Sequence, residues 1–363
     1  MKETLFRREK VAFSLREMFS LYGYQMYQMT QFEEYDLYLK NKEFLVSDRV
    51  ITFNDPSGRL LALKPDVTLS IIKNHTPQKG VKEKVAYNEN VYRFSPAAGR
   101  YKEILQSGVE ALGDLDEYDL FEVVFLAAES LSKMGGDFRL VLSHAGLLAA
   151  FLKEAGGDES FAAECASFIS EKNAHDLAIL CDRAGVAEAI KEKLLLFVNV
   201  YGKRREVLAR LAPLCREGAA KEAFEELSLL SGLLEKTPVS DKILFDFSVV
   251  NNMRYYNGVV FKGYLDGVCE SVLSGGCYDY LMKKMQKNSR GLGFAVYLDL
   301  LEEEKAESGA DVLLLYDDSL SPDQVRKAAQ EERKKGKSVT CQRAVPQGWK
   351  YKETLDLRKE KQC

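Results

Sequence analysis

A run of helical periodicity over residues 144–236 lies between two regions whose patterns predict β-strands. Strand patterns resume only after this run, so a single core is expected to combine segments from both sides of it. This order favours an α+β protein with an all-helical insertion. The helical segments are Leu147–Lys153, Phe161–Ile169, Leu177–Cys181, Ala187–Leu196, Arg204–Leu211 and Ala219–Leu234, and the later strands are predicted at Leu244–Val250, Val259–Gly263 and Val268–Leu273.

The region before the insertion predicts a mixture of helices and strands. Residues 5–22 carry apolar side chains at helical spacing, and Gly23 follows them as a typical helix stop. The residues from Asn54 to Gly58 form a strong turn signal between two short strands. Pro65 suits the first turn of a helix. The other predicted elements are strands Arg49–Phe53 and Arg59–Leu63, helix Val67–Lys73, strands Lys84–Phe94 and Glu103–Gly113 around the loop Ser95–Arg100, and helix Tyr118–Met134.

The pattern changes again near the C-terminus. Gly291–Leu301 is small and apolar at its start and helical afterwards, and Glu302–Gly309 is a charged linker. A short β-α-β fragment is then predicted, and we expect the charged tail Tyr351–Cys363 to be mobile. The fragment consists of Asp311–Tyr316, Asp323–Gly336 and Ser338–Gln342. We therefore predict a core of residues 1–143 and 237–305, a helical insertion of residues 144–236, and a short α/β segment of residues 306–363.

Composition indicates a globular protein without a general affinity for nucleic acid. Of the 363 residues, 46% are hydrophobic and 29% are charged, which suffices for a core of ordinary size. The net charge of -4 gives no overall basic surface, so nucleic acid is an unlikely partner. No apolar run approaches the roughly 20 residues of a membrane span, and the N-terminus lacks an apolar signal core. We expect a cytoplasmic protein that does not bind membranes.

Cysteine and histidine spacing indicates neither a metal site nor a disulfide framework. The seven cysteines are scattered, and no two of them stand two positions apart as in zinc knuckles or redox pairs. His75, His144 and His175 are spread along the chain and mostly lack nearby candidate partners. We therefore expect no metal and no cofactor.

Three stretches of the chain share their residues with one protein family. The first is Leu63-Lys64-Pro65-Asp66-Val67-Thr68, the second contains Val91-Tyr92-Arg93, Gly99-Arg100-Tyr101, Gln106 and Glu110, and the third contains Tyr255-Tyr256-Asn257-Gly258 and Ser274-Gly275-Gly276-Cys277-Tyr278-Asp279. Together they resemble the active-site segments of histidyl-tRNA synthetase, over residues 5–135 and 240–305. The resemblance implies a class II aminoacyl-tRNA synthetase-like antiparallel sheet flanked by helices.

The chain departs from the synthetases where ATP is bound. Asn251 and Leu300 stand where that family has arginines, and Tyr297 replaces a glycine, so that its bulk is expected to fill the adenine slot. Loss of one preorganised donor costs an enzyme about 10²–10³ in rate, so loss of two should make adenylate formation negligible. The chain is more similar to the family's non-synthetase paralogue, the regulatory subunit of ATP phosphoribosyltransferase. No catalytic residue is therefore assigned.

The resemblance also implies roles for individual residues. Those matching the family's contacts to the histidine ammonium are Asp66, Thr68 and Gln106, and those matching its contacts to the imidazole are Glu110, Tyr256 and Tyr278. The candidate anion or nucleotide contacts are Arg93, Arg100 and Arg254. Taken singly, each of these residues also fits a structural role. Asp66 can charge the first turn of a helix, the tyrosines can be core aromatics, and Arg93 and Arg254 can form structural salt bridges.

Three hypotheses follow for the function of the chain. The first is a histidine-sensing regulatory subunit that activates the catalytic subunit of short-form ATP phosphoribosyltransferase, as a homodimer within a larger hetero-oligomer. The second is a diverged, truncated histidyl-tRNA synthetase-like enzyme that forms an adenylate, with Arg254 replacing the arginine lost at position 251. The third is a nucleic-acid-binding or scaffold protein. The acidic balance and the missing phosphate contacts favour the first.

Overall fold

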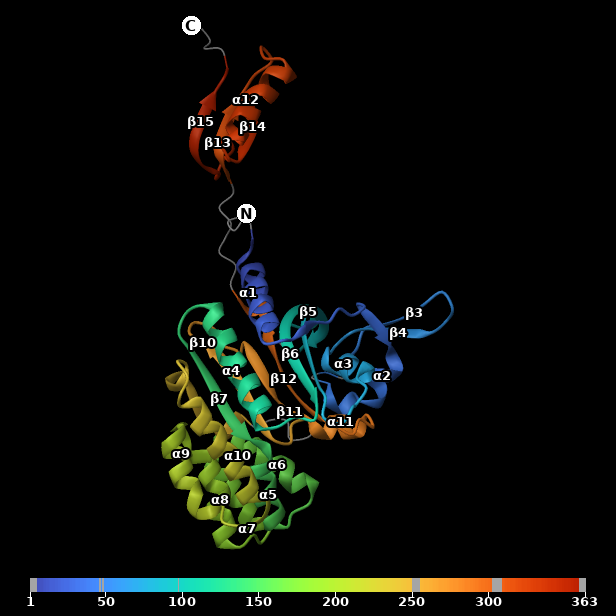
Figure 1. Cartoon of the computed structure of the whole chain (residues 1–363), viewed down its shortest axis with the longest axis vertical. Helices are drawn as coiled ribbons and strands as arrows, with labels where there is room; N and C mark the ends of the chain where they lie inside the picture. Colours follow the sequence, from blue (N-terminus) through green and yellow to red (C-terminus); the bar gives the residue numbers. More distant parts are fainter. Residues whose placement is uncertain are drawn as a thin grey trace. The chain divides into compact units, whose positions relative to one another are not determined.

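The computed structural model describes residues 5–45, 47, 49–96, 98–249, 255–301 and 309–358 (Figure 1). The chain divides into two compact units, Met1–Glu302 and Glu303–Cys363. The first contains the sheets and helices that surround the candidate site. The second is a small α/β unit.

A nine-stranded sheet forms the centre of the first unit, in the order β1-β5-β6-β12-β11-β10-β7-β9-β8. Along this order, each pair of neighbouring strands from β5 through β6, β12, β11 and β10 to β7 is antiparallel. The pairs β1–β5 and β7–β9 are parallel. The predicted α+β fold with a synthetase-like antiparallel sheet is confirmed. The strands span β1 Gln25–Met26, β5 Lys82–Ser95, β6 Arg100–Gly113, β7 Phe138–His144, β8 Tyr201–Lys203, β9 Ile243–Asp246, β10 Val259–Leu265, β11 Leu273–Cys277 and β12 Arg290–Tyr297.

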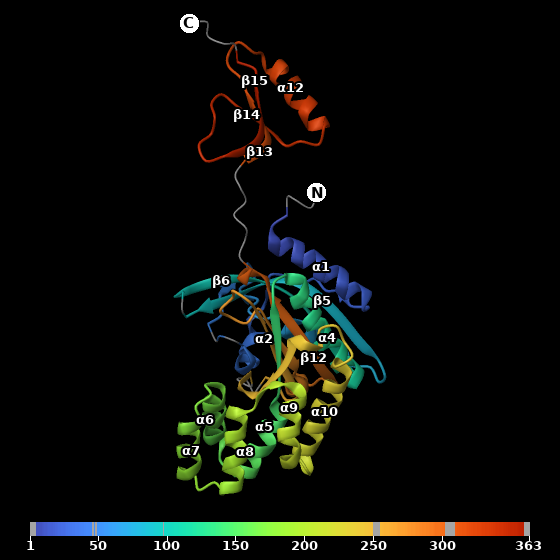
Figure 2. The same cartoon turned by 90° about the vertical axis from the view of Figure 1, so that its left-hand side faces the viewer.

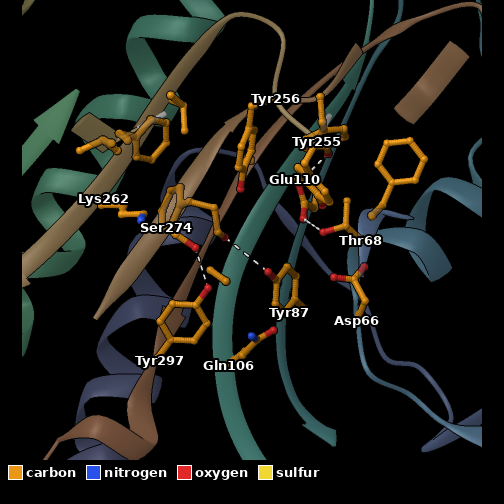
Figure 3. Close-up of a pocket in the computed structure, with 18 of the residues that line it drawn as sticks. Asp66, Thr68, Tyr87, Gln106, Glu110, Tyr255, Tyr256, Lys262, Ser274 and Tyr297 are labelled. Atoms are coloured by element: carbon orange, nitrogen blue, oxygen red, sulfur yellow. Dashed lines mark hydrogen bonds between the residues drawn. The ribbon is translucent and has the colours of Figure 1, made fainter. Parts of the chain in front are cut away.

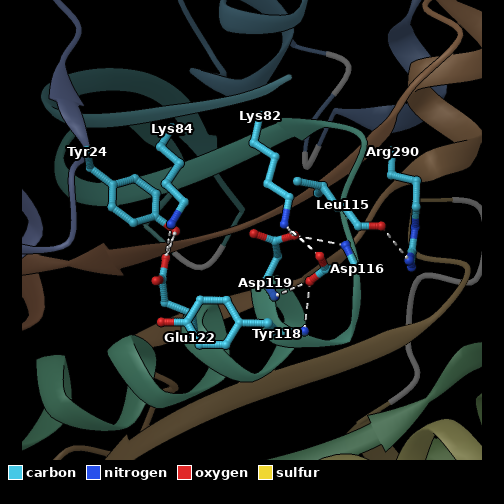
Figure 4. A network of polar contacts seen from close by, with 9 residues as sticks. All are labelled: Tyr24, Lys82, Lys84, Leu115, Asp116, Tyr118, Asp119, Glu122 and Arg290. Carbon is cyan, nitrogen blue, oxygen red and sulfur yellow. Dashed lines mark hydrogen bonds and ion pairs between the residues drawn. The ribbon is translucent and has the colours of Figure 1, made fainter. Parts of the chain in front are cut away.

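Helices α1 (Arg7–Leu21) and α4 (Glu117–Met134) cover one face of this sheet. Asp116 caps α4 by accepting hydrogen bonds from its first turn, and the helix ends at Gly135, whose φ of 84° favours glycine. Figure 4 shows two lysines of β5 paired with carboxylates at the start of α4. Lys82 contacts Asp116 and Asp119 at 2.7 Å, and Lys84 lies 2.6 Å from Glu122. These pairs fix the helix against the edge of the sheet.

The opposite face of the sheet carries a second layer. A three-stranded antiparallel sheet, β2 (Phe32–Glu34), β4 (Leu60–Leu63) and β3 (Thr52–Asn54), lies in this part of the unit. Helices α2 (Tyr35–Lys40), α3 (Thr68–Asn74) and α11 (Asp279–Lys284) contribute to its separate hydrophobic core. Lys64 follows β4, and its fully buried ammonium forms an ion pair with Glu89 of β5. The pair joins this layer to the main sheet.

The chain forms six helices after β7 and before β9, and these helices lie together (Figure 2). They are α5 Ala145–Ala155, α6 Glu159–Ser170, α7 Ala174–Arg183, α8 Glu188–Asn199, α9 Arg204–Leu211 and α10 Gly218–Leu234. Five of the six predicted helical segments lie within these helices, and the sixth, Ala187–Leu196, begins one residue before α8. The expectation of an all-helical insertion is wrong in one respect, because β8 lies between α8 and α9 and pairs with β9. Sequence periodicity misses this strand because it is only three residues long.

Two contacts hold the N-terminal end of α5. The backbone N–H of Ala145 donates to the carbonyl oxygen of Gly258 at 2.8 Å. His144, which caps α5, lies 2.8 Å from Glu226 of α10 through its Nε2 atom. The N-terminus of α5 is thus held by the loop before β10 and by α10.

Three other predictions within the first unit are wrong. Val268–Leu273 is not a strand, because β11 begins only at Leu273. Gly291–Leu301 is not mainly helical, because β12 continues to Tyr297 and only a short 3-10 turn follows. The strand predicted at Leu244–Val250 ends at Asp246. In each case small or apolar residues fit two conformations, and pairing with a neighbouring strand decides between them.

The second unit is a parallel three-stranded sheet in the order β14-β13-β15 with one helix. The elements are β13 Gly309–Leu315, α12 Pro322–Lys334, β14 Val339–Gln342 and β15 Lys350–Asp356. The predicted β-α-β elements are confirmed. The expected mobile tail is wrong for Tyr351–Asp356, which belong to β15, and residues 359–363 lie outside the described chain. No described helix of either unit is long and apolar enough to cross a membrane.

Candidate functional site

A cavity of about 230 Å³ lies on the face of the large sheet opposite α1 and α4 (Figure 3). Side chains alternate between the two faces of a strand. On β6, Val109 and Ala111 therefore pack in the core beneath α4, whereas Gln106 and Glu110 face the cavity. The structure brings all six predicted histidine contacts around it, namely Asp66, Thr68, Gln106, Glu110, Tyr256 and Tyr278.

Glu110 lies at the centre of the polar contacts in this cavity. It is 2% exposed, and its Oε1 accepts a hydrogen bond from the Thr68 hydroxyl at 2.6 Å while its Oε2 accepts one from the Tyr278 hydroxyl at 2.6 Å. The pKa of Glu110 is raised to about 8, mainly by burial. The two hydrogen bonds oppose this shift, and the nearby Asp66 contributes to it. Burial in the ligand-free protein therefore favours the protonated form of this carboxyl group.

Two glycines of β12 make room for these side chains. A Cβ atom on Gly293 would lie 1.8 Å from Oε2 of Glu110, and one on Gly291 would lie 2.2 Å from the ring of Tyr278. Gly293 is the register partner of Glu110 in the neighbouring strand. These two glycines are therefore needed for the shape of the cavity floor.

Asp66 and Arg93 lie close together near the N-terminal end of α3. Asp66 Oδ1 accepts a hydrogen bond from the Leu69 backbone at 2.9 Å, and its Oδ2 lies 3.7 Å from Arg93 Nη2. Arg93 Nε also donates to the Pro65 carbonyl at 2.7 Å. Burial raises the pKa of Asp66, and the positive charge of Arg93 opposes this shift. Arg93 borders the cavity but is held by these contacts, so a structural role for it is directly visible.

Gln106 and Tyr256 each carry a polar group that faces the cavity and has no hydrogen-bond partner among the described residues. Gln106 is 2% exposed, and none of the described residues hydrogen-bonds its side-chain amide. The hydroxyl of Tyr256 likewise lacks a hydrogen-bond partner within the described part of the chain. Buried polar groups are normally paired, because leaving them unpaired is costly. Both groups are therefore available to a bound molecule.

The remaining residues singled out in the sequence lie elsewhere. Arg100 is exposed at the tip of the β5–β6 hairpin, paired with Ser95, and does not border the cavity. Arg254 and Asn251 lie outside the described residues. Leu300 packs against the main hydrophobic core. Tyr297 does border the cavity, and its hydroxyl lies 2.6 Å from Ser274 Oγ.

Sequence reasoning missed Lys262, Tyr87 and the contact role of Ser274. Lys262 stands in the otherwise mostly apolar strand β10 and borders the cavity. A lysine at the centre of an apolar strand is a signal that was available in the sequence. Tyr87 carries no such signal, because a tyrosine in a strand is common.

Neither a metal site nor a reactive thiol is present among the described residues of the cavity. The described chain contains no cluster of three or more potential metal-ligating side chains. Cys277 is 2% exposed and does not border the cavity, and burial raises the pKa of its thiol far above the usual range. A protonated, buried thiol is a poor nucleophile. The cavity is thus equipped for binding by hydrogen bonds and charge.

Comparison with known proteins agrees with this geometry. The family model for histidyl-tRNA synthetase matches residues 2–301. The chain belongs to the histidyl-tRNA synthetase family. Within this family, it is 29% identical over 349 residues to an ATP phosphoribosyltransferase regulatory subunit from Bacillus licheniformis, a match that covers 92% of this chain and 87% of that relative. The predicted resemblance to these regulatory subunits is confirmed.

Two solved structures have folds similar to that of this chain. One, from Bacillus halodurans C, is described as an ATP phosphoribosyltransferase regulatory subunit/histidyl-tRNA synthetase; it has a TM-score of 0.79 and 25% identity and covers 97% of this chain and 94% of its own. The other belongs to an ATP phosphoribosyl transferase (HisG:HisZ) complex from Thermotoga maritima, with a TM-score of 0.62 and 19% identity, over 80% of this chain and 97% of that chain. The second likeness concerns the fold alone.

Proposed function

We propose that this chain is a non-catalytic regulatory subunit of ATP phosphoribosyltransferase that binds free histidine in the cavity above β6. The observation that carries the proposal is the convergence of six side chains, from four separate segments of sequence, on one amino-acid-sized space. Its volume of about 230 Å³ is below the roughly 300–1,000 Å³ of sites for drug-sized ligands. An amino acid is a suitable occupant, whereas an amino acid together with a nucleotide is too large.

The polar groups match the chemistry of histidine. The imidazole needs a partner at each ring nitrogen, and Glu110 and the free hydroxyl of Tyr256 supply such partners. The ammonium needs acceptors, which Asp66 and the unpaired amide oxygen of Gln106 supply. A site with polar groups at both ends disfavours analogues that leave one of them unpaired. Histidine therefore satisfies this cavity better than an apolar amino acid.

The position of Tyr297 supports binding without adenylate formation. Its ring borders the cavity and its hydroxyl contacts Ser274, so it occupies space where the resemblance predicts a glycine beside adenine. Leu300, which stands in place of a family arginine, packs into the hydrophobic core and offers no charge to a phosphate. Both features favour a sensor over an adenylate-forming enzyme.

Regulation requires that histidine bind one state of the complex better than another. A tenfold difference in affinity corresponds to about 1.4 kcal/mol of coupling. We propose the catalytic subunit of short-form ATP phosphoribosyltransferase as the partner, and a homodimer within a larger hetero-oligomer as the assembly. The names of the relative and of the Thermotoga complex support this partner. We place the complex in the cytoplasm, in keeping with the free thiols of the six described cysteines.

Two measurements on the purified chain test the proposal. Isothermal titration calorimetry with L-histidine should show saturable binding, and addition of the chain to the short catalytic subunit should raise its activity in a histidine-dependent way. A pyrophosphate-exchange assay with ATP and histidine should show no turnover. Absence of a binding signal at millimolar histidine would contradict the sensor role, and clear exchange would support an enzyme instead.

A further inference from the structure

Lys262 is a cation beside the cavity, and none of the residues that the structure describes provides it with a counter-ion. It lies half-buried on β10, and no carboxylate of the described chain is within ion-pair distance of its ammonium. Removing an ammonium from water without a partner is unfavourable. The carboxyl groups of Asp66 and Glu110 lie on the other side of the cavity, as Figure 3 shows for the labelled side chains. Carboxyl groups thus lie on one side of the cavity and an ammonium lies on the other.

Lys262 belongs to a row of polar side chains that crosses four neighbouring strands. In the strand register, Lys262 of β10 is opposite Ser274 of β11, and Tyr297 of β12 is opposite Gln106 of β6. Register partners project to the same face of a sheet, so these four side chains share the face of the cavity. Ser274 and Tyr297 are joined by their 2.6 Å hydroxyl contact. The row therefore offers an ammonium, two hydroxyls and an amide to one ligand.

The dimensions suit an amino-acid zwitterion. Three strand spacings separate β10 from β6 in the order of the sheet, which is about 14 Å between backbones. Between these two strands, Ser274 of β11 and Tyr297 of β12 also line the cavity. A free amino acid carries its carboxylate and its positive group only a few bonds apart. The Asp66 carboxyl group on one side of the cavity and the Lys262 ammonium on the other thus suit the ammonium and the carboxylate of one small ligand.

We propose that Lys262, assisted by the Ser274 hydroxyl, binds the carboxylate of the amino acid in this cavity and makes the site selective for a free α-amino acid. This inference rests on the proposed function, because it assumes that histidine is the ligand. The lysine supplies a charge in a site where the sequence has lost a family arginine at position 251. A ligand that keeps the imidazole and the ammonium but lacks the carboxylate leaves Lys262 unpaired.

Binding of L-histidine and L-histidinol, in which an alcohol replaces the carboxylate, tests this assignment by calorimetry. The wild-type chain should bind histidine at least about 10-fold more tightly than histidinol, because charge-assisted hydrogen bonds are worth about 10- to 100-fold in affinity. Lys262→Met should lower histidine affinity by this factor and change histidinol affinity less than about twofold. Lys262→Arg should restore most of the preference, and the exposed-lysine control Lys283→Met should change neither value.

The outcomes separate this inference from the proposed function. If the wild-type chain binds histidine and histidinol equally, or if Lys262→Met keeps the preference or weakens both ligands alike, the lysine assignment is wrong while histidine binding stands. If the wild-type chain binds neither ligand, the proposed function fails and the lysine assignment fails with it. The wild-type comparison needs no variant, so it remains decisive even if Lys262→Met does not fold.

Discussion

Glu110 of β6 and Gly293 of β12 are register partners, and the glutamate side chain passes directly over the glycine. A β-carbon at position 293 would lie 1.8 Å from Glu110 Oε2 and 2.4 Å from the Val109 carbonyl oxygen. The carboxyl group can therefore reach Thr68 and Tyr278 only because the adjacent strand has no side chain there. The glycine is as much a part of the site as the acid.

Gly293→Ala should consequently destabilise the protein and abolish histidine binding. Overpacking of a tight core costs about 1–3 kcal/mol, and the displaced Glu110 would lose its two hydroxyl donors. The matched control is Gly232→Ala, on an exposed position of α10 where a Cβ meets no atom within 4 Å. This control should be stabilised by about 0.5–1 kcal/mol and should bind normally. Urea unfolding and calorimetry measure both effects; equal behaviour of the two variants would contradict the argument.

Glu110→Gln should make the ligand-free protein more stable at alkaline pH and bind histidine poorly. The folded-state pKa of Glu110 is about 8, above its ordinary value of 4.5, so the native state keeps a proton that the unfolded chain has released. The wild-type protein therefore loses stability as pH rises from about 4.5 to 8, by roughly 2–4 kcal/mol. Glutamine cannot ionise, so the difference between variant and wild type should grow between pH 5 and pH 8 in urea unfolding. A constant difference would show that the Glu110 pKa is not raised.

Gln106→Leu should reduce histidine affinity without a loss of stability. The amide has no hydrogen-bond partner in the described chain, so leucine removes no native hydrogen bond at this buried position. A ligand contact worth about 1–1.5 kcal/mol would be lost, which is about a tenfold fall in affinity. Ser143→Ala is the control, because it also removes a buried unpaired polar group, here a hydroxyl that does not border the cavity. Its affinity should equal that of the wild type, and a similar loss in both variants would exclude a direct contact by Gln106.

Lys64→Met should destabilise the first unit strongly, because it leaves the Glu89 carboxylate without its buried partner. Removal of one member of a buried ion pair costs about 3–5 kcal/mol. Lys40→Met breaks an exposed pair with Asp36, whose members are 75% and 70% exposed, and should change stability by less than about 1 kcal/mol. Thermal unfolding of both variants tests the contrast. Comparable effects would mean that the Lys64 pair contributes no more than a surface pair.

Much of the fold could be predicted from the sequence because its helices are long and periodic. The predicted helix Tyr118–Met134 matches α4 almost to the residue, and Gly135 ends it in the sequence as in the structure. The failures are short or featureless elements. The strand β8 has three residues, and β11 consists largely of small residues whose conformation is fixed by pairing with β10 and β12. Local sequence carries too little information about such pairing.

The residues of the site could be predicted where they stand at positions of a family motif. Residues outside these motifs could not be predicted. Glu110 and Thr68 stand at motif positions, and the structure brings them to 2.6 Å. Lys262 stands at no motif position quoted for the family, and only the register of β10 shows that it shares a face with Ser274. Arg100 is part of a family motif, but it lies at the tip of the β5–β6 hairpin and does not border the cavity. A motif therefore predicts residue identity better than it predicts position.

The hydrogen bond from Ala145 to Gly258 connects the first residue of α5 to the loop that carries Tyr256. Gly258 follows Tyr256 by only two positions, and Tyr256 borders the cavity. Because our proposal places a ligand against this tyrosine, we expect bound histidine to slow amide exchange at the N-terminus of α5.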